Sequence, residues 1–306
     1  MEVKDIVQGT NEWLEWRRTG ITATEASVIA DTSPFKSPLE LYHDKIRSEP
    51  VAPVSSVAME WGSRLESAIV QKFCDEHGCE ATCSKLYRHD RIPWALASLD
   101  AETDLNGEHV IIECKTSNDS SKWADDSVPE YYRDQVQWQM FVTGIKTTYF
   151  SVLVNGREWF ERKVVADPKR QEELFNACMV FKQHVDNKVP PEASDKHAAS
   201  DTKLLLESRC DVSEETLEVD DDVYNRYRSA KAALEQAESE MELVKLDLAK
   251  RLGNMAALTY GGKKFVTVVN RKPTASIDSK LLQAKHPQAY FDCIKMSKGS
   301  SYMKII

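Results

Sequence analysis

The stretch LASLDAETDLNGEHVIIECKTS, residues 96–117, decides the fold, because it places an Asn-Gly pair between two strand-like runs. Asn-Gly in this setting is the strongest short-range signal for a hairpin with a two-residue type I′ turn. The turn fixes which residues of the two strands face each other. It predicts three facing pairs: Leu105 with Glu108, Thr103 with Val110, and Asp100 with Glu113.

This register gathers charged side chains on one face of the hairpin. Facing side chains have Cβ atoms about 4.5–5.5 Å apart, and strand alternation places Lys115 beside Glu113 and Asp100. The opposite face is apolar, with Val110, Ile112 and Cys114. Two close carboxylates repel each other unless a cation lies between them or one is protonated. The hairpin alone is also compatible with solvated acids and a surface salt bridge to Lys115.

A hard divalent cation suits this arrangement, since Mg²⁺ prefers oxygen ligands and commonly takes one or two carboxylates plus a substrate phosphate. The main-chain carbonyl of Cys114 could add another oxygen. Lys115 could position or help to deprotonate an attacking water, and stabilise charge on the phosphate. The pattern therefore predicts metal-assisted phosphodiester hydrolysis.

The surrounding sequence predicts helices and a second hairpin. Residues 57–77 form a helix with Glu66 toward its core side, and residues 129–143 form another that stops at Gly144. Asn155-Gly156 indicates a second two-residue type I′ turn, and Asp167-Pro168 begins a helix. Residues 13–30 indicate a short helix, a glycine break and a helix capped by Thr22 or Thr24. This order predicts an α/β core with a central mixed sheet flanked by helices.

The chain is predicted to divide at a polar, proline-bearing stretch. We expect a catalytic domain at residues 1–190, a linker at 191–203 and a C-terminal α+β module at 204–306. The module begins with a long helix that has two sets of seven-residue steps: Val223, Ala230, Ala237 and Val244, and Tyr227, Leu234, Met241 and Leu248. Such heptads indicate a coiled-coil or helical-hairpin seam, whose partner could be another subunit or the same domain. A Gly261-Gly262 hairpin, a helix near residues 277–285 and a final strand, residues 301–306, follow.

Charge is unevenly distributed along the chain. The formal net charge is −9, but residues 253–306 hold nine Lys or Arg and two acidic residues. This basic segment could hold nucleic-acid phosphates, dock a protein partner or form a solvated face. Its candidate DNA contacts are Lys263, Lys264, Arg271 and Lys272.

Cysteine usage and hydropathy exclude other classes. The seven cysteines lack the paired Cys-x-x-Cys spacing of zinc sites. No apolar run is long enough to span a membrane, and residues 1–13 lack a secretion-signal pattern. We therefore expect a cytoplasmic protein, in a bacterial cell or a phage-infected host.

Four blocks carry a resemblance to a known family. SLD followed by IIECKTS resembles the Asp…Glu-x-Lys motif of the PD-(D/E)xK nuclease superfamily, with Leu99 replacing the usual proline. EWLEWRRTGITATEAS (12–27), WGSRLESAIV (61–70) and YYRDQVQWQMFVTG (131–144) resemble the lambda-exonuclease/YqaJ family of viral recombinases. The blocks follow the family's order over residues 8 to about 165.

The resemblance implies a role for each matching residue. Asp100, Glu113 and the Cys114 carbonyl would be metal ligands, Lys115 the catalytic lysine, and Glu66 a supporting carboxylate. Arg17 and Thr24 would hold the 5′-phosphate of DNA, although the neighbouring Arg18 leaves a one-residue shift open. Tyr132 and Gln135 would line the active-site cleft. The implied cofactor is Mg²⁺, for which Mn²⁺ substitutes.

The predicted function is a Mg²⁺-dependent 5′-to-3′ exonuclease that acts on double-stranded DNA ends. It would leave 3′ overhangs for phage-type recombination with a single-strand annealing protein, and the family implies a ring-shaped homotrimer. Two alternatives remain open: an endonuclease with the same metal chemistry, and a non-catalytic DNA-binding recombination factor. A cluster-bearing Cas4-like nuclease is disfavoured because Cys178, Cys210 and Cys293 are dispersed.

Overall fold

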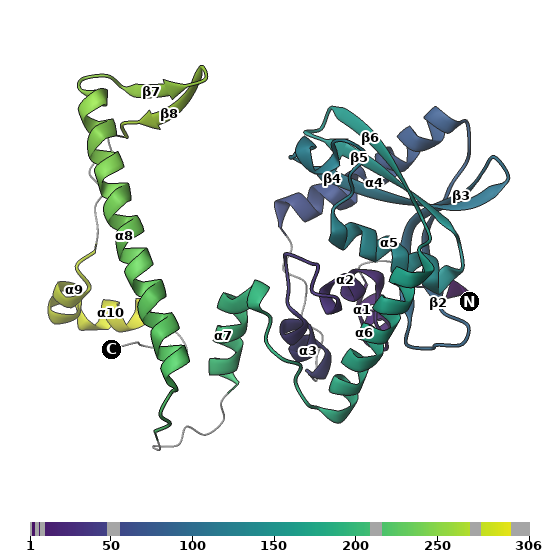
Figure 1. Ribbon diagram of the computed structural model, residues 1–306, viewed down its shortest axis with the longest axis horizontal. Coiled ribbons are helices and arrows are strands. Elements are labelled where there is room, and N and C mark those ends of the chain that lie inside the picture. The colour runs from purple at the N-terminus through teal and green to yellow at the C-terminus, as the bar shows by residue number, and fades with distance from the viewer. Residues whose placement is uncertain are drawn as a thin grey trace. The chain divides into compact units, whose positions relative to one another are not determined.

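The computed structural model of the chain has two units, which we describe separately (Figure 1). Unit 1 comprises Met1–Arg209 with Ser301–Ile306, and unit 2 comprises Cys210–Ser300. The structure describes residues 2–3, 6, 10–47, 56–208, 216–269 and 277–294.

Unit 1 is built on a six-stranded mixed sheet whose strands follow chain order. The strands are β1 (Glu2–Val3), β2 (Thr82–Arg88), β3 (Leu96–Leu105), β4 (Glu108–Ser117), β5 (Thr147–Val154) and β6 (Glu158–Val165). Neighbours are antiparallel except β4 and β5, which are parallel. A parallel pair needs a crossover, and the helix α5 (Glu130–Thr143) lies within it. The predicted mixed sheet is confirmed.

The β3–β4 hairpin has the predicted turn and register. Asn106 and Gly107 have φ values of 53° and 83°, as a type I′ turn requires. Leu105 pairs with Glu108 and Thr103 pairs with Val110, so these two predicted pairs are confirmed. The ladder ends at Ala101 and Ile112, one position before the third predicted pair, Asp100 with Glu113, which stays a prediction.

The β5–β6 connection differs from its prediction. Val154 pairs with Glu158, so the loop contains three residues and the two-residue turn predicted for Asn155-Gly156 is wrong. Asn155 and Gly156 do have positive φ values, and the N–H of Arg157 donates to the Val154 carbonyl at 3.1 Å, as in a tight turn centred on them. The strands nevertheless pair again only at Glu158, so Arg157 is an extra residue on the β6 side of the turn.

Helices cover both faces of the sheet (Figure 1). On one face, Ile69 and Phe73 of α4 (Val57–His77) pack against Val110 and Ile112 of β4. On the other, Val136 and Met140 of α5 pack against residues of β3, β4 and β5, among them Leu99, Ile111 and Phe150. The face of β4 that carries Glu113 therefore lies toward α5, and α4 packs on the opposite face.

A helical layer supports α5 from behind. It comprises α2 (Ala23–Ile29), α3 (Pro38–Ile46) and α6 (Pro168–Asn187), whose buried residues share one core with Trp138 and Val142 of α5. The short helix α1 (Asn11–Arg18) precedes α2, and Thr22 is the N-cap of α2 in a capping box with Glu25. Asp167 caps α6 and Gly144 ends α5, as predicted.

The linker predicted for residues 191–203 is corrected by the structure. This segment contains the 3-10 helix η2 (Asp195–His197) and the start of α7 (Ala198–Glu207). Asp201 is fully buried and accepts hydrogen bonds from the Ser37 hydroxyl and the Ser194 N–H. Lys196 donates to the carbonyls of Asp31 and Thr32. A segment with few apolar residues is thus fixed to unit 1 by buried polar contacts.

Unit 2 contains the predicted long helix, α8 (Asp221–Leu252), which Asp220 caps and Gly253 ends. A hairpin of β7 (Ala257–Tyr260) and β8 (Lys263–Thr267) follows, with its turn at Gly261-Gly262. The helix α9 (Ser279–Lys285) was predicted, whereas α10 (Pro287–Cys293) was not. The predicted strand at residues 301–306 lies outside the described residues. Of the helices that the structure describes, none could cross a membrane.

Candidate active site

Asp100 lies where the pairing of β3 with β4 ends. The register of the two strands runs from Leu105–Glu108 to Ala101–Ile112. At the next position the Oδ2 atom of Asp100 accepts a hydrogen bond from the Cys114 N–H at 2.8 Å. The carboxylate therefore takes a main-chain donor of the neighbouring strand, which holds Asp100 beside the residues that flank Cys114.

Glu113 is the buried centre of the cluster, with only 1% of its surface exposed. Its Oε1 atom accepts from the Lys115 ammonium and from Gln135 Nε2 at 2.5 Å. Its Oε2 atom accepts from Gln139 Nε2 at 2.8 Å, and the same amide also donates to the Ser98 carbonyl. These donors offset the cost of burying a carboxylate and fix its orientation.

An aromatic wall borders Lys115. The ammonium lies 4.8 Å from the centroid of the Tyr132 ring, which stacks on Trp123 and contacts Tyr131. Phe35 extends the wall outward: its ring meets Tyr131 edge-on at 5.6 Å, and 74% of its surface is exposed. Flat apolar rings beside an ammonium form a surface that suits nucleobases and phosphates.

The cluster holds more negative than positive charge. Burial raises the pKa of Asp100 well above its usual value, the charges of Glu113 and Glu66 raise it further, and Lys115 and the Cys114 N–H partly oppose them. Burial and the charge of Glu113 also raise the pKa of Glu66, which places this α4 side chain within electrostatic reach. Three carboxylates thus share one ammonium.

Lys115 is held in its charged form. Burial alone would lower its pKa, but the charges of Glu113 and Asp100 outweigh this effect and raise it. An ammonium of this kind stabilises anionic charge and has no lone pair with which to accept a proton at neutral pH. A charged ammonium suits the stabilisation of anionic charge predicted for Lys115, and its other predicted roles, positioning or helping to deprotonate water, stay predictions.

The donor set fits a hard divalent cation. It consists of carboxylate oxygens with excess negative charge, the ligands that Mg²⁺ and Mn²⁺ prefer. Burial raises the pKa of the Cys114 thiol, so its carbonyl is the better donor. Within the described ranges, no three Asp, Glu, His or Cys side chains are already arranged as a metal site. Glu113 is instead occupied by Lys115, Gln135 and Gln139, so a bound cation would replace a donor there.

The predicted phosphate-binding residues lie at the turn between α1 and α2. Arg17 Nη2 donates to Thr22 Oγ1 at 3.3 Å, and its guanidinium lies 4.4 Å from the Trp13 ring centroid. Thr24 is exposed in the first turn of α2. Arg18 instead donates to the Arg47 carbonyl, which makes Arg17 the arginine that faces α2. The structure therefore joins Arg17 to Thr22, which was predicted only as a cap.

A buried lysine that sequence reasoning missed braces this turn. Lys45 of α3 donates to the carbonyls of Arg17 and Gly20 at 3.1 and 2.6 Å and pairs with Glu25 at 2.9 Å, while only 7% of its side chain is exposed. The sequence around Lys45 gives no signal for this role, because its partners lie more than one helix away. Gln139 was also missed as a site residue, although its helical spacing from Tyr132 and Gln135 signalled a shared face.

The remaining predicted contacts belong to unit 2. Lys263 and Lys264 are exposed on β8. Arg271 and Lys272 lie outside the described residues.

Part of this chain matches the fold of a solved protein. LHK-Exo in complex with dAMP aligns with a TM-score of 0.52 and 21% identity over 64% of this chain and 100% of that chain. A second structure, an alkaline exonuclease (LHK-Exo) from Laribacter hongkongensis, aligns with a TM-score of 0.49 and 20% identity over the same shares, 64% and 100%. The first likeness establishes the fold class: a mixed sheet flanked by helices, as in that protein.

The family resemblance is confirmed over the region that contains the site. Residues 12–146 match the model of the YqaJ-like viral recombinase domain. The uncharacterized protein YqaJ of Bacillus subtilis (strain 168) is 29% identical over 299 residues, which cover 94% of this chain and 91% of that protein. The match to the family model spans Arg17, Glu66, Asp100, Glu113 and Lys115.

Proposed function

We propose that this protein is a metal-dependent nuclease that degrades one strand of linear duplex DNA from its 5′ end and leaves a 3′ single-stranded tail. The cluster of Asp100, Glu113, Glu66 and Lys115 carries this proposal, since excess carboxylate beside one fixed ammonium suits phosphodiester hydrolysis. Two further observations support it: the match to the YqaJ-like viral recombinase domain, and a fold shared with an exonuclease.

The residues that would hold Mg²⁺ or Mn²⁺ are Asp100, Glu113 and the Cys114 carbonyl, with Glu66 supporting the ion or its waters. When bound, the cation supplies Lewis-acid activation of the phosphate and of water. Gln135 and Gln139 orient Glu113 before substrate arrives. Because preorganised groups need no rearrangement during reaction, this bracing lowers the barrier.

Lys115 binds the scissile phosphate in this scheme. Its ammonium is held between Glu113 and the Tyr132 ring, and its raised pKa keeps it charged. A fixed positive charge stabilises the anionic oxygens of the phosphate as negative charge develops in the transition state. Tyr132 excludes water from one side of the ammonium and strengthens that interaction.

The 5′ terminus of the strand is proposed to bind at the turn between α1 and α2. Arg17 supplies the cation and Thr22 the hydroxyl that orients it, with the exposed Thr24 alongside. Arginine binds phosphate through a planar set of donors, which favours a terminal phosphate over a hydroxyl. Lys263 and Lys264 of unit 2 are proposed to contact duplex or exiting strand through the backbone phosphates.

We propose that the 3′ tail passes to a single-strand annealing protein, in recombination of the phage type, and that the nuclease works as a homo-oligomer. Both proposals follow from the match to the recombinase domain.

A strand-resolved digestion assay tests the function. Linear duplexes with a 5′-phosphate or a 5′-hydroxyl, each labelled on one strand, are incubated with Mg²⁺, and a circular duplex of the same sequence serves as the control. We expect the strand with the 5′-phosphate to shorten from that end and the circle to survive. Lys115→Met and Glu113→Gln should lower the rate at least about a hundredfold, whereas Asp104→Asn, an exposed acid on β3, should not.

The assay also separates the alternatives. Cleavage of the circle would indicate an endonuclease. Shortening of a strand from its 3′ end would contradict the proposed role of Arg17. If purified protein shows no hydrolysis with Mg²⁺ or Mn²⁺ while Asp100→Ala leaves recombination in cells intact, the chain is a DNA-binding factor and the catalytic proposal is wrong.

A further inference from the structure

The helix α8 presents an apolar seam that the described residues of its own unit leave uncovered. Leu234 and Met241 are 60% and 54% exposed, and Val223 and Val244 are about half exposed. Only Tyr227 and Leu248, near the two ends of the seam, are half-buried. Exposure of a row of large apolar side chains to water is unfavourable, and burying them against a matching helix lowers the free energy.

The two columns of the seam differ in size. One column, at heptad position a, holds the larger residues: Tyr227, Leu234, Met241 and Leu248. The other column, at position d, holds the smaller ones: Val223, Ala230, Ala237 and Val244. A partner helix must therefore place small residues opposite the large column and large residues opposite the small column.

From this size pattern we propose that α8 pairs in an antiparallel direction with α8 of a second copy of this chain. Antiparallel pairing sets position a against position d of the partner helix. It produces four kinds of layer, each occurring twice: Tyr227 with Val244, Leu234 with Ala237, Met241 with Ala230, and Leu248 with Val223. Each layer joins a large residue to a small one.

A parallel pair of the same helices packs poorly. It would set a against a and d against d, so layers of two Leu or two Met would alternate with layers of two Ala. Overfilled and underfilled layers both destabilise a core that is packed at crystal density. The column sizes therefore select the antiparallel direction.

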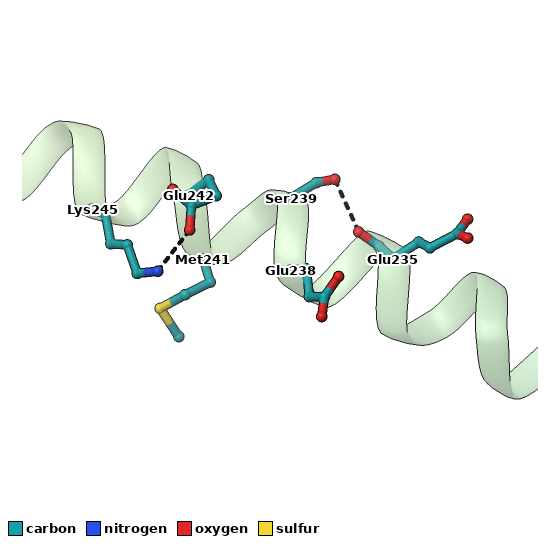
Figure 2. Close-up of a pocket in the computed structure, with 6 residues that line it drawn as sticks. All are labelled: Glu235, Glu238, Ser239, Met241, Glu242 and Lys245. Atoms are coloured by element: carbon teal, nitrogen blue, oxygen red, sulfur yellow. Dashed lines mark hydrogen bonds and ion pairs between the residues drawn. The ribbon is translucent and has the colours of Figure 1, made fainter. Parts of the chain in front are cut away.

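The charges that flank the seam agree with this direction. In the antiparallel register Lys231 approaches Glu238 of the partner helix, and Arg226 approaches Asp247, each pair occurring twice. In a parallel pair Arg226 would instead approach Lys231, a contact between like charges. Figure 2 shows Glu238, Met241 and Lys245 projecting from the same side of α8, while Ser239 points away. The flanking charges thus border the seam.

The match is also self-complementary, which identifies the partner as a second copy. Every pairing above is reciprocal: Leu234 of one helix contacts Ala237 of the other, and Ala237 of the first contacts Leu234 of the second. This is the requirement for a two-fold symmetric interface. The paired segment, residues 223–248, is about 39 Å long at 1.5 Å per residue, enough for a stable coiled coil.

Charge reversal tests the proposal on the full-length protein. Lys231→Glu sets like charges opposite Glu238 twice per dimer and should raise the dissociation constant about tenfold, measured by sedimentation equilibrium. Adding Glu238→Lys should restore it, and Arg228→Glu, outside the seam, should leave it unchanged. Helicity by circular dichroism confirms that each variant folds. If unit 1 forms oligomers as well, the comparison between wild type and variant still isolates α8.

Disulfide trapping tests the direction. Leu234→Cys and Ala237→Cys are made separately, in a protein whose Cys83, Cys210 and Cys293 are serine, and are then mixed and oxidised. The antiparallel register predicts a disulfide dimer in the mixture and little in either variant alone. Dimers of each variant alone would indicate a parallel pair and overturn the proposal. Absence of any α8-dependent dimer, or a Lys231→Glu variant with unchanged mass and affinity, would overturn it as well.

Discussion

Replacing Asp100 with Asn tests whether the carboxylate cluster is built for a cation. Asn retains an oxygen for the Cys114 N–H, which lies 2.8 Å from the carboxylate, but removes one negative charge that faces Glu113 and Glu66. Because the folded-state pKa of Asp100 is raised above that of the unfolded chain, its ionised form destabilises the folded protein. This cost is absent below about pH 4 and is complete once the pH exceeds the folded-state pKa.

The magnitude follows from removing this cost at neutral pH. Relief of one unfavourable charge should stabilise the protein without metal by about 0.5–2 kcal/mol, which corresponds to about 1–8 °C in Tm for a unit of this size. Mg²⁺ at a hundred times its Kd should stabilise the wild type by about 2.7 kcal/mol and the variant by much less. The order of the two Tm values should therefore invert when Mg²⁺ is added.

Thermal unfolding by calorimetry, in excess EDTA and in millimolar MgCl₂, measures both effects. Asp104→Asn is the matched control, because Asp104 is an exposed acid on the same strand, and its Tm should change little in either buffer. The reasoning is refuted if Asp100→Asn is less stable than wild type in EDTA, or if Mg²⁺ stabilises both proteins equally.

Two further substitutions test parts of the site, and a third tests the pH dependence of stability at His89, which is not a site residue and whose ring stacks on Phe141. Gln139→Leu leaves a buried oxygen of Glu113 without its donor, so unfolding by denaturant should show a loss of about 1–3 kcal/mol, and kcat should fall more than KM rises. Lys45→Met breaks a buried ion pair and should destabilise the protein by about 3–5 kcal/mol; the ratio of rates on 5′-phosphate and 5′-hydroxyl ends should also fall, because Arg17 loses its brace. Burial lowers the pKa of His89, so the folded protein disfavours its charged form and loses stability as pH falls below about 6.5; His89→Asn should show a smaller drop in Tm between about pH 8 and about pH 5.

The hairpin could be predicted because its information is local. An Asn-Gly turn fixes the register of β3 and β4, and alternation then fixes which side chains share a face. The same arithmetic failed at Asn155-Gly156, where the strands pair again only at Glu158 and Arg157 is an extra residue in the loop. Turn residues specify a bend more reliably than the number of residues in it.

Long-range polar contacts could not be predicted. Lys45 braces a turn that lies 25–28 residues earlier in the chain, and Asp201 is buried against Ser37, 164 residues away. Neither contact produces a pattern in the periodicity or composition of the sequence. Asp201, which contacts Ser37, lies within the predicted linker, and the structure assigns that segment to unit 1. Gln139 lies between these cases, since helical spacing placed it on the right face of α5 but could not show that it reaches Glu113.

The position of the cluster at the end of the β3–β4 ladder links its charge to the fold. Asp100 replaces a strand carbonyl as the partner of the Cys114 N–H, so the residue that adds negative charge also completes main-chain pairing. Glu113 is held by three side-chain donors from β4 and α5, which fix its position while like charges accumulate around it. Such a site sacrifices stability to keep its groups preorganised. A cation that neutralises the cluster would then meet carboxylates whose positions packing and hydrogen bonds have already fixed, and would have to displace only a donor of Glu113.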